Sequence, residues 1–514
     1  MKKIKVLAFL IAFCLFLIGI SLYHNLQLEK SLPSNGWSRS ITFPESVGMS
    51  PSFTYQDGNE YHIYNHDKEK IIHFIVDDKL EIKNIIKIPI QLPALAPFWA
   101  KGEQIIFYRN SEIIYFDGEK EKLLFKDVEG MAANEKNIVY WDNDELFSID
   151  LKTLKNTSLG KSNYKIDNVI LNNETSSFLV TSDRASINLR VTIFQKINGS
   201  YQPTEVATIS EAGVEEVTGF SFIEKNDELS IMYTTFSTAQ HKLNYRAYFT
   251  KVSMVNDVVK ANFEEMLFYD EKSNERLRKP RFVVMFLKEN KPTILFSSEG
   301  FTIGKRRAIN IYESVQKDEK WIANRRDTGA GVSVQPVYLH DGAILWLDYS
   351  AKIYTLKGAS TNPETIEKSR MVTSDDWINS LSYSLSGIFT GLLLLFIGLL
   401  WIIVPAIFLL IVSFINSELI EKGTKWVEWT SIGLYVGTQL LFSQRVFNQS
   451  VYSFAPDYLT FPGSFIIIPL ILALIAYYFT RMSYNEEWGM LRKIFNFIGL
   501  DILFLLLLVG PYTL

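Results

Sequence analysis

The charged residues of this 514-residue chain are distributed very unevenly along its length. From Asn379 to Leu514, 13 of 136 residues are charged, roughly 10%, whereas the preceding 378 residues carry the other 95, about 25%. A quarter is the usual share in a globular domain, and long stretches with few charges are typical of membrane-spanning segments. The chain therefore combines a large water-soluble part with a membrane part. Its net charge of −4 excludes a strongly basic nucleic-acid-binding protein.

The N-terminus has a basic start followed by an apolar stretch. Residues 1–4 are expected in the cytoplasm and 5–23 as a transmembrane anchor, because Val6–Leu22 carries no charge and has about the spanning length. Small residues do not line up for signal peptidase, so we expect an uncleaved anchor, with a cleaved signal peptide as the alternative. The only cysteine, Cys14, lies inside the anchor, so the soluble part can form no disulfide. This favours a bacterial envelope protein over a secreted animal protein.

The C-terminal hydrophobic region divides into four further expected spans, which are 384–415, 429–446, 463–480 and 495–512. As one helix the first would be roughly 48 Å long, against a hydrocarbon core of about 30 Å. It must therefore tilt, kink at Pro405 or project from the membrane.

Positive charges in the flanking segments set the orientation of the spans. Lysines cluster at the N-terminus, Lys422 and Lys425 precede the second C-terminal span, and Arg481, Arg492 and Lys493 lie before the last, whereas the loop 447–462 has no Lys or Arg. The sequence predicts a multi-pass protein of the cell membrane with five spans. Its N-terminus would be cytoplasmic and residues 24–383 extracytoplasmic.

Between expected linkers at 24–37 and 371–383, residues 38–370 show short apolar runs separated by Asp, Asn, Gly and Lys, the pattern of an all-β domain. Strand–turn–strand copies begin at positions 53, 105, 138, 178, 231, 294 and 344, six intervals over 291 residues, about 48 each. Four-stranded propeller blades have about this length. We expect an extracytoplasmic β-propeller of seven blades. Eight blades, or another all-β fold such as a two-sheet sandwich, stay open as alternatives.

Two groups of residues were considered as metal sites. His62 and His66 stand four apart in an expected strand, about 13 Å from each other, too far to share one ion. We expect them to be surface histidines. Asp142, Asp144 and Glu145 form an acidic turn that could attract calcium, but hairpin turns favour Asp for backbone reasons. The sequence therefore predicts no metal site and no cofactor.

A run of basic residues forms a candidate anion-binding rim. Lys305, Arg306 and Arg307 are consecutive, and Arg325 with Arg326 could join them to hold an anionic glycan or a lipid head group. A solvated loop is the simpler interpretation of such a run. The basic rim is therefore a hypothesis, and it requires these side chains to be exposed and close together.

Ionisable residues inside expected spans form a second candidate site. Asp501 lies about 10 Å beyond the cytoplasmic start of the last span, and Arg445 lies at the outer end of another. Their depths differ, so we expect no pair between them. Asp501 is expected to meet Gln439 or a lysine at the inner edge as a structural contact, with a proton or ion relay as the alternative. Arg445 is expected to extend to the outer interface.

No nucleophile elbow, zinc-protease helix or phosphate-binding loop is present in the sequence. Paired glycosidase carboxylates need no fixed spacing and stay open, but we do not expect an enzyme. Two function classes follow. The first is a sensor or scaffold that binds a ligand, or another envelope protein, on its extracytoplasmic propeller. The second is an accessory subunit of a transport or membrane-insertion complex. Apart from the lipid bilayer, the partner would be an envelope protein or an extracellular ligand, and not a nucleic acid.

Overall fold

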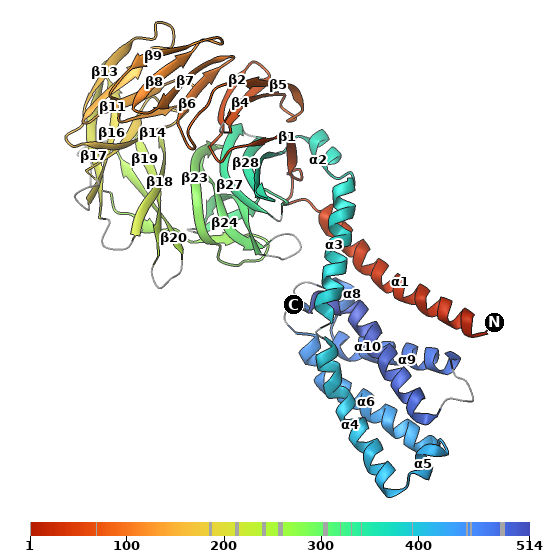
Figure 1. The fold of residues 1–514 in the computed structure, drawn as a ribbon. Coiled ribbons are helices and arrows are strands. Elements are labelled where there is room, and N and C mark those ends of the chain that lie inside the picture. The colour runs from red at the N-terminus through yellow and green to blue at the C-terminus, as the bar shows by residue number, and fades with distance from the viewer. Residues whose placement is uncertain are drawn as a thin grey trace. The chain divides into compact units, whose positions relative to one another are not determined.

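A computed structural model describes residues 2–67, 69–183, 188–210, 215–238, 243–254, 261–301, 307–318, 320–329, 331–340, 342–392, 394–448, 451–452, 455–483 and 489–513. The chain forms two compact units. A β-rich unit comprises most of Leu32–Met371, and a helical unit comprises Met1–Ser31 and Val372–Leu514. Figure 1 labels the strands and helices of both units.

The β-rich unit is a β-propeller in which five four-stranded antiparallel sheets form separate blades. Figure 1 shows them following one another in chain order, from β2 in red to β20 in green. Their strands are β2 (Phe53–Asp57), β3 (Glu60–His66), β4 (Ile71–Val76) and β5 (Ile82–Ile88); β6 (Phe98–Lys101), β7 (Gln104–Arg109), β8 (Glu112–Phe116) and β9 (Glu121–Phe125); β10 (Gly130–Ala133), β11 (Ile138–Asp142), β12 (Glu145–Ile149) and β13 (Asn156–Lys161); β14 (Ile166–Leu171), β15 (Phe178–Ser182), β16 (Asn188–Ile197) and β17 (Ser200–Ser210); β18 (Glu215–Lys225), β19 (Glu228–Ser237), β20 (Asn244–Ser253) and β21 (Glu264–Glu265).

Nine more strands form a single sheet. They are β1 (Ile41–Val47), β22 (Phe268–Asp270), β23 (Arg278–Lys288), β24 (Lys291–Phe301), β25 (Arg307–Lys317), β26 (Lys320–Arg325), β27 (Val332–His340), β28 (Ala343–Ser350) and β29 (Ile353–Ser360). Strands β23 to β26 make one antiparallel run, and β27, β28, β29 and β1 make another. The seven separate blades expected from the repeat are not seen as seven sheets, so that number stays a prediction.

Every expected repeat start lies in a strand, but the first is out of register with the others. Positions 105, 138, 178, 231, 294 and 344 fall in the second strand of a four-stranded sheet or run, whereas position 53 falls in the first strand of its sheet. Two-residue turns with positive φ close several hairpins, for example Asn110–Ser111 after β7 and Asn226–Asp227 before β19. Such turns match the twist of paired strands, which is why the strand–turn–strand units stand out in the sequence.

The expectation of surface histidines at 62 and 66 is wrong. His62 is 9% exposed and His66 2% exposed, because both faces of β3 are covered by neighbouring structure. His62 Nδ1 lies 2.8 Å from Nε2 of His73, a residue of the adjacent strand β4 that the sequence analysis did not connect with it. Tyr55 stacks on His62 and Tyr64 stacks on His73. The histidines therefore belong to an aromatic core layer.

The chain segment before β1 is fixed to the β-rich unit. The ring of Trp37 is buried, with the Arg326 guanidinium 4.7 Å and the Lys288 ammonium 5.5 Å from its centre. Both cations pair with Glu313, at 3.1 Å and 2.7 Å. At the other end of the unit, the short helix α2 (Pro363–Ser369) accepts a backbone hydrogen bond from Arg39 at Ser369 Oγ. The first and last segments of the β-rich unit are therefore both held by contacts within that unit.

The helical unit consists of α1 (Lys2–Glu29), α3 (Ser374–Gly391), α4 (Leu394–Ile415), α5 (Glu418–Glu421), α6 (Lys425–Val446), α8 (Asp457–Thr460), α9 (Ser464–Ser483), α10 (Met490–Leu508) and a 3₁₀ turn at Gly510–Tyr512. Among the described residues, three helical segments are long and apolar enough to cross a membrane: Ile4–Glu29, Gly398–Ile415 and Ser464–Ser483. The expected spans 429–446 and 495–512 correspond largely to α6 and α10, and the five-span topology stays a prediction.

The expected span 384–415 is not one helix. Its first residues belong to α3, which begins at a capping box formed by Thr373 and Asp376, and α4 follows after Leu392. Pro405 lies inside α4, so the interruption is not at the proline. Gly391 packs closely on Gly510, where a Cβ atom would lie 2.9 Å from the Gly510 Cα. The division between two helices removes the need to fit one 32-residue helix to the membrane thickness.

Candidate functional site

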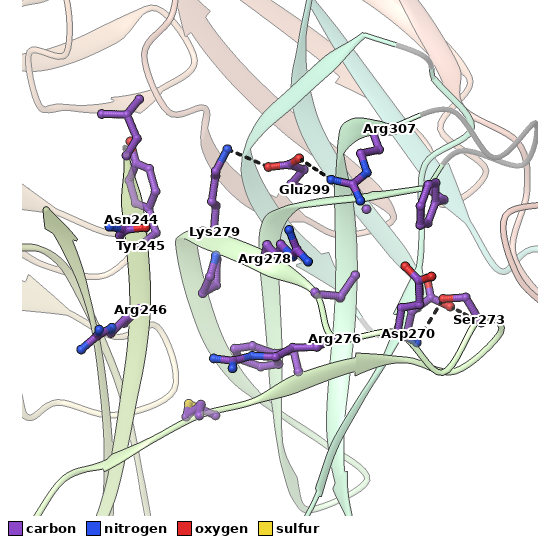
Figure 2. Close-up of a pocket in the computed structure, with 18 of the residues that line it drawn as sticks. Asn244, Tyr245, Arg246, Asp270, Ser273, Arg276, Arg278, Lys279, Glu299 and Arg307 are labelled. Atoms are coloured by element: carbon purple, nitrogen blue, oxygen red, sulfur yellow. Dashed lines mark hydrogen bonds and ion pairs between the residues drawn. The ribbon is translucent and has the colours of Figure 1, made fainter. Parts of the chain in front are cut away.

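A pocket of about 970 Å³ opens in the β-rich unit beside β20 and the strands β22 to β25. Figure 2 shows that Tyr245 and Arg246 come from β20 on one side, and Glu299 and Arg307 from β24 and β25 on the other. The lining contains five basic side chains and four carboxylates, together with apolar groups. The ionisable members are Arg246, Arg276, Arg278, Lys279, Arg307, Glu265, Asp270, Glu275 and Glu299.

Irregular backbone in β23 places two neighbouring cations in this pocket. The register of β23 against β24 shifts between Arg278 and Arg281 and again between Arg281 and Val284. Lys279 and Phe282 have φ of +59° and +52°, which is a strained conformation for residues with a side chain. Side chains of a regular strand alternate between faces, whereas Arg278 and Lys279 both line the pocket. The bulges therefore redirect consecutive basic residues to one place.

Glu299 is paired with two cations and lies near a third. Lys279 Nζ is 2.7 Å from Glu299 Oε2, and Arg307 Nη1 is 3.7 Å from Oε1, as the dashed lines in Figure 2 show. Arg278 is the residue paired with Glu299 across β23 and β24. The hydrogen bond from Lys279, with the charges of Lys279, Arg307 and Arg278, holds the pKa of Glu299 below its ordinary value although partial burial opposes this. The carboxylate is therefore ionised at neutral pH.

The other charged groups of the lining have different partners. Arg276 Nη2 lies 3.0 Å from Glu265 Oε1, and Arg246 Nη1 lies 3.0 Å from an oxygen of Glu215 outside the pocket. Asp270 Oδ1 accepts backbone N–H groups of the turn that follows it, at 2.8 Å and 3.0 Å. Arg278 is exposed and, within the described residues, its guanidinium forms no ion pair. It is thus a cation available to a ligand.

The structure separates the residues of the expected basic rim. Arg307 lines the pocket and lies over the ring of Phe301, 5.5 Å from its centre, whereas Lys305 and Arg306 lie outside the described residues. The expectation that Arg325 and Arg326 extend the rim is wrong, because both are buried. Arg325 pairs with Asp327 at 2.9 Å and Arg326 pairs with Glu313 at 3.1 Å.

These carboxylates explain why two arginines can be buried. An ion that is removed from water is tolerated in a protein interior when it is paired and hydrogen-bonded. Asp327 lies two residues from Arg325, but Glu313 is on another strand and is brought to Arg326 only by the pairing of β25 with β26. Arg325 and Arg326 therefore belong to a buried ion-pair network, which the count of basic residues along the sequence does not reveal.

The acidic turn considered for calcium joins β11 to β12. Asp142 pairs with Glu145 in the strand register, and Glu145 forms an ion pair with Lys161. Asn143 in this turn has φ of +53°, which accounts for a polar residue there on backbone grounds. In the described part of the chain, no three His, Cys, Asp or Glu side chains are grouped so that they could hold a metal ion.

The second candidate site, within the helical unit, brings Asp501 of α10 together with α6. Asp501 Oδ2 accepts hydrogen bonds from Gln439 Nε2 at 2.5 Å and from Tyr435 Oη at 2.8 Å, and all three residues are buried. Gln439 was expected as a partner of Asp501, whereas Tyr435 was not. Its position four residues before Gln439, on the same helix face, was the available signal. Arg445 instead lies over the ring of Phe442, 4.9 Å from its centre.

Comparison with family models and with curated proteins gives no match. Among solved structures, a protein of unknown function from Dyadobacter fermentans DSM 18053 aligns with 63% of this chain and 99% of its own, at 9% identity and a TM-score of 0.37. Hsv2 from Kluyvelomyces marxianus aligns with 52% of this chain and 81% of its own, at 14% identity and a TM-score of 0.29. With TM-scores this low, neither alignment bears on the site.

Proposed function

We propose that this chain is a multi-pass protein of the cell membrane that displays a seven-bladed propeller outside the cytoplasm and binds a ligand there, as a sensor or scaffold. The observation that carries the binding role is the pocket beside β20 and β23, whose volume of about 970 Å³ lies in the range of small-molecule sites. Nine of its lining residues carry acidic or basic side chains, so the wall is more highly charged than the mostly apolar wall of an average small-molecule site, and this favours a charged ligand.

Strand pairing supports the count of seven blades. The two antiparallel runs of the nine-stranded sheet are joined through β25 and β27 by a single residue pair, Ile309 with Val332. Each antiparallel run has four strands, the number in each of the five separate blades, and the ninth strand, β22, adds to the first run by pairing in parallel with β26. The second run is completed by β1, the first strand of the unit, which pairs with β29, the last. Such a pairing closes a ring of blades and leaves no free edge between its ends.

The membrane arrangement is proposed from the charge distribution of the flanking segments. Three segments have the length and composition of spans. With α6 and α10 as two further spans, the positive charges of the short loops between spans all fall on the cytoplasmic side, as the positive-inside rule expects. With lysines at the N-terminus placed in the cytoplasm, the whole β-rich unit lies outside. In this arrangement Arg445 reaches the outer interface, and Asp501 is a structural contact between α6 and α10.

The binding role can be tested by photo-crosslinking in native membranes. A photoreactive amino acid at Leu243, which is exposed and lines the pocket, should capture a small molecule of defined mass, identified by mass spectrometry of the digested protein. Tyr349, an exposed residue outside the pocket lining, is the matched control position. The same adduct at both positions, or none at Leu243, would contradict ligand binding in this pocket.

A further inference from the structure

We propose that the pocket binds a doubly charged phosphate group through Arg278, Lys279 and Arg307, with Glu299 occupying part of that site in the ligand-free protein. This inference rests on the proposed ligand-binding function, and it names the chemical class of the ligand. It is carried by the arrangement of these four side chains rather than by the net charge of the pocket.

The local charge balance is the first argument. Lys279 and Arg307 contact Glu299, and the charge of Arg278 also acts on this carboxylate, which leaves an excess of two positive charges near it. Elsewhere in the described lining, Asp270 and Glu275 keep their negative charges, but they belong to the end of β22 and the turn after it and form no ion pair with any of these three cations. Glu265 is paired with Arg276, Asp270 accepts the N–H groups of its own turn, and Glu275 is an exposed residue of that turn. A dianion would balance the excess, whereas a second monoanion would not.

The chemistry of the three cations is the second argument. A guanidinium presents parallel N–H donors that match two oxygens of a phosphate, and an ammonium adds a flexible point charge. Arg278 has no ion pair with any described residue, so a ligand would not have to displace a partner from it. Lys279 and Arg307 already hold carboxylate oxygens of Glu299, which shows that their side chains can reach an oxyanion in this part of the pocket.

The backbone of β23 is the third argument. Two residues with positive φ, Lys279 and Phe282, occur within five positions of one strand, and this conformation is strained for residues with a side chain. As a consequence, the side chains of the consecutive residues Arg278 and Lys279 both line the pocket, whereas in a regular strand they would face opposite sides. Phe301 and Leu277 line the same cavity and offer an apolar surface to the organic part of a phosphate ester.

The test measures phosphate binding to the full-length protein in neutral detergent. Inorganic phosphate and glycerol 3-phosphate are the probes, with acetate as a monoanion, and binding is followed by equilibrium dialysis at low ionic strength. We expect saturable binding of both phosphates, weaker binding of acetate, and loss of affinity as salt is added. Absence of saturable phosphate binding, or equal binding of acetate, would overturn the proposal.

Variants assign the binding to this site. Arg278→Ala should weaken phosphate binding about tenfold, since a hydrogen bond to a charged group is lost, and Arg278→Lys should recover part of it. Arg109→Ala removes an ion-paired arginine from a different blade and is the matched control, with unchanged binding expected. The near-ultraviolet circular dichroism of each variant verifies its fold. Unchanged affinity in Arg278→Ala would show that the phosphate binds elsewhere.

The role of Glu299 gives a result of opposite sign. Glu299→Gln removes the competing negative charge and frees Lys279 and Arg307, so phosphate should bind about fivefold more tightly, as expected for one unit charge at contact distance in a solvated site. A general loss of structure would weaken binding instead. Equal or weaker phosphate binding in Glu299→Gln would refute the idea that this carboxylate occupies the ligand site.

A further arm distinguishes a lipid head group from a soluble phosphate. Nanodiscs of phosphatidylcholine with added phosphatidic acid should raise the glycerol 3-phosphate concentration needed for half-saturation if the head group reaches the pocket. If half-saturation requires the same glycerol 3-phosphate concentration in nanodiscs with and without phosphatidic acid, the ligand is a soluble phosphate. An adduct at Leu243 that contains no phosphate would overturn this inference and leave pocket binding intact, so the two proposals fail separately.

Discussion

Acidification should destabilise the propeller through the buried pair His62 and His73. Burial and the neighbouring His62 lower the pKa of His73 to about 4, and burial also lowers the pKa of His62 although Asp57 and Glu60 oppose it. His73 Nε2 shares a hydrogen bond with His62, and its Nδ1 is buried without a hydrogen-bond partner among the described residues. A proton on His73 would therefore add an N–H group and a charge that the core cannot satisfy.

The size of the effect follows from linkage between protonation and folding. In the unfolded chain the pKa of a histidine is about 6.5, so below that pH the unfolded state takes up a proton that folded His73 resists. Stability is thus greatest above about pH 6.5, and the His73 contribution falls as pH drops, by about 1.4 kcal/mol for each pH unit, until pH reaches the folded pKa near 4. Between about pH 8 and about pH 5 the calculated loss is about 2 kcal/mol.

Urea unfolding of a fragment covering residues 32–371, followed by tryptophan fluorescence, measures this loss. Other groups also titrate in the range, so the comparison is with His73→Gln, which keeps a hydrogen-bonding side chain and removes the titration. The fall in unfolding free energy from about pH 8 to about pH 5 should be smaller in the variant by about 2 kcal/mol. An equal fall in both proteins would refute the assignment of the pH dependence to His73.

Four further outcomes are expected. The 32–371 fragment expressed alone should be soluble and monomeric with a β-type far-ultraviolet circular dichroism spectrum, and a strongly helical spectrum would contradict the fold. In a chain without its native cysteine, cysteines replacing Asp457 and Glu421 should react with impermeant reagents from outside and from inside respectively, and reversed labelling would exclude the five-span topology. Asp501→Leu should reduce accumulation in the membrane because two buried donors lose their acceptor, whereas Asp501→Asn should accumulate normally. If both variants accumulate normally and Asp501→Asn abolishes proton or ion transfer across the membrane, Asp501 is part of a relay. Trp37→Ala should lower the unfolding free energy of the fragment by about 3–5 kcal/mol in urea titrations, and a change below about 1 kcal/mol would mean that the ring is not an anchor.

Except in the first sheet, where the copy begins in β2, the sequence locates the second strand of each sheet or run, for a physical reason. These strands are covered on both faces, so they appear as unbroken apolar runs such as residues 105–108 in β7. The outer strands are different. In β5, β9 and β13 most residues are exposed or half-buried, and no apolar period marks them. The strand–turn–strand copies could therefore be located from the sequence, whereas the sheet edges and the joining of the last two runs could not.

The pocket was only partly predictable, because its residues are brought together by strand pairing and by bulges. Arg307 was noticed as part of a basic run, but Arg278 and Lys279 lie almost thirty residues earlier and share a cavity with it only through β24. Bulged positions interrupt the alternation on which strand patterns depend. His73 and Tyr435 were missed for a similar reason. Their partners lie on neighbouring elements, and the packing of those elements cannot be inferred from the local sequence.

Strands β23 and β25 carry both the pocket cations and two residues of the network around Trp37, namely Lys288 and Glu313. The contacts around Trp37 therefore restrict the backbone that positions the pocket cations. Strand β23 carries Lys279 near its start and Lys288 at its end, while β25 carries Arg307 at its start and Glu313 further along. Lys288, at the end of β23, and Glu313, in the middle of β25, form a network with Arg326. Burial opposes ionisation of Glu313, but Arg326 and Lys288 hold its pKa below the ordinary value. Strands fixed in this way hold the backbone positions of Arg278, Lys279 and Arg307, so a ligand has to order only their side chains. Rigid strands beneath exposed basic side chains are therefore what a preorganised anion site requires.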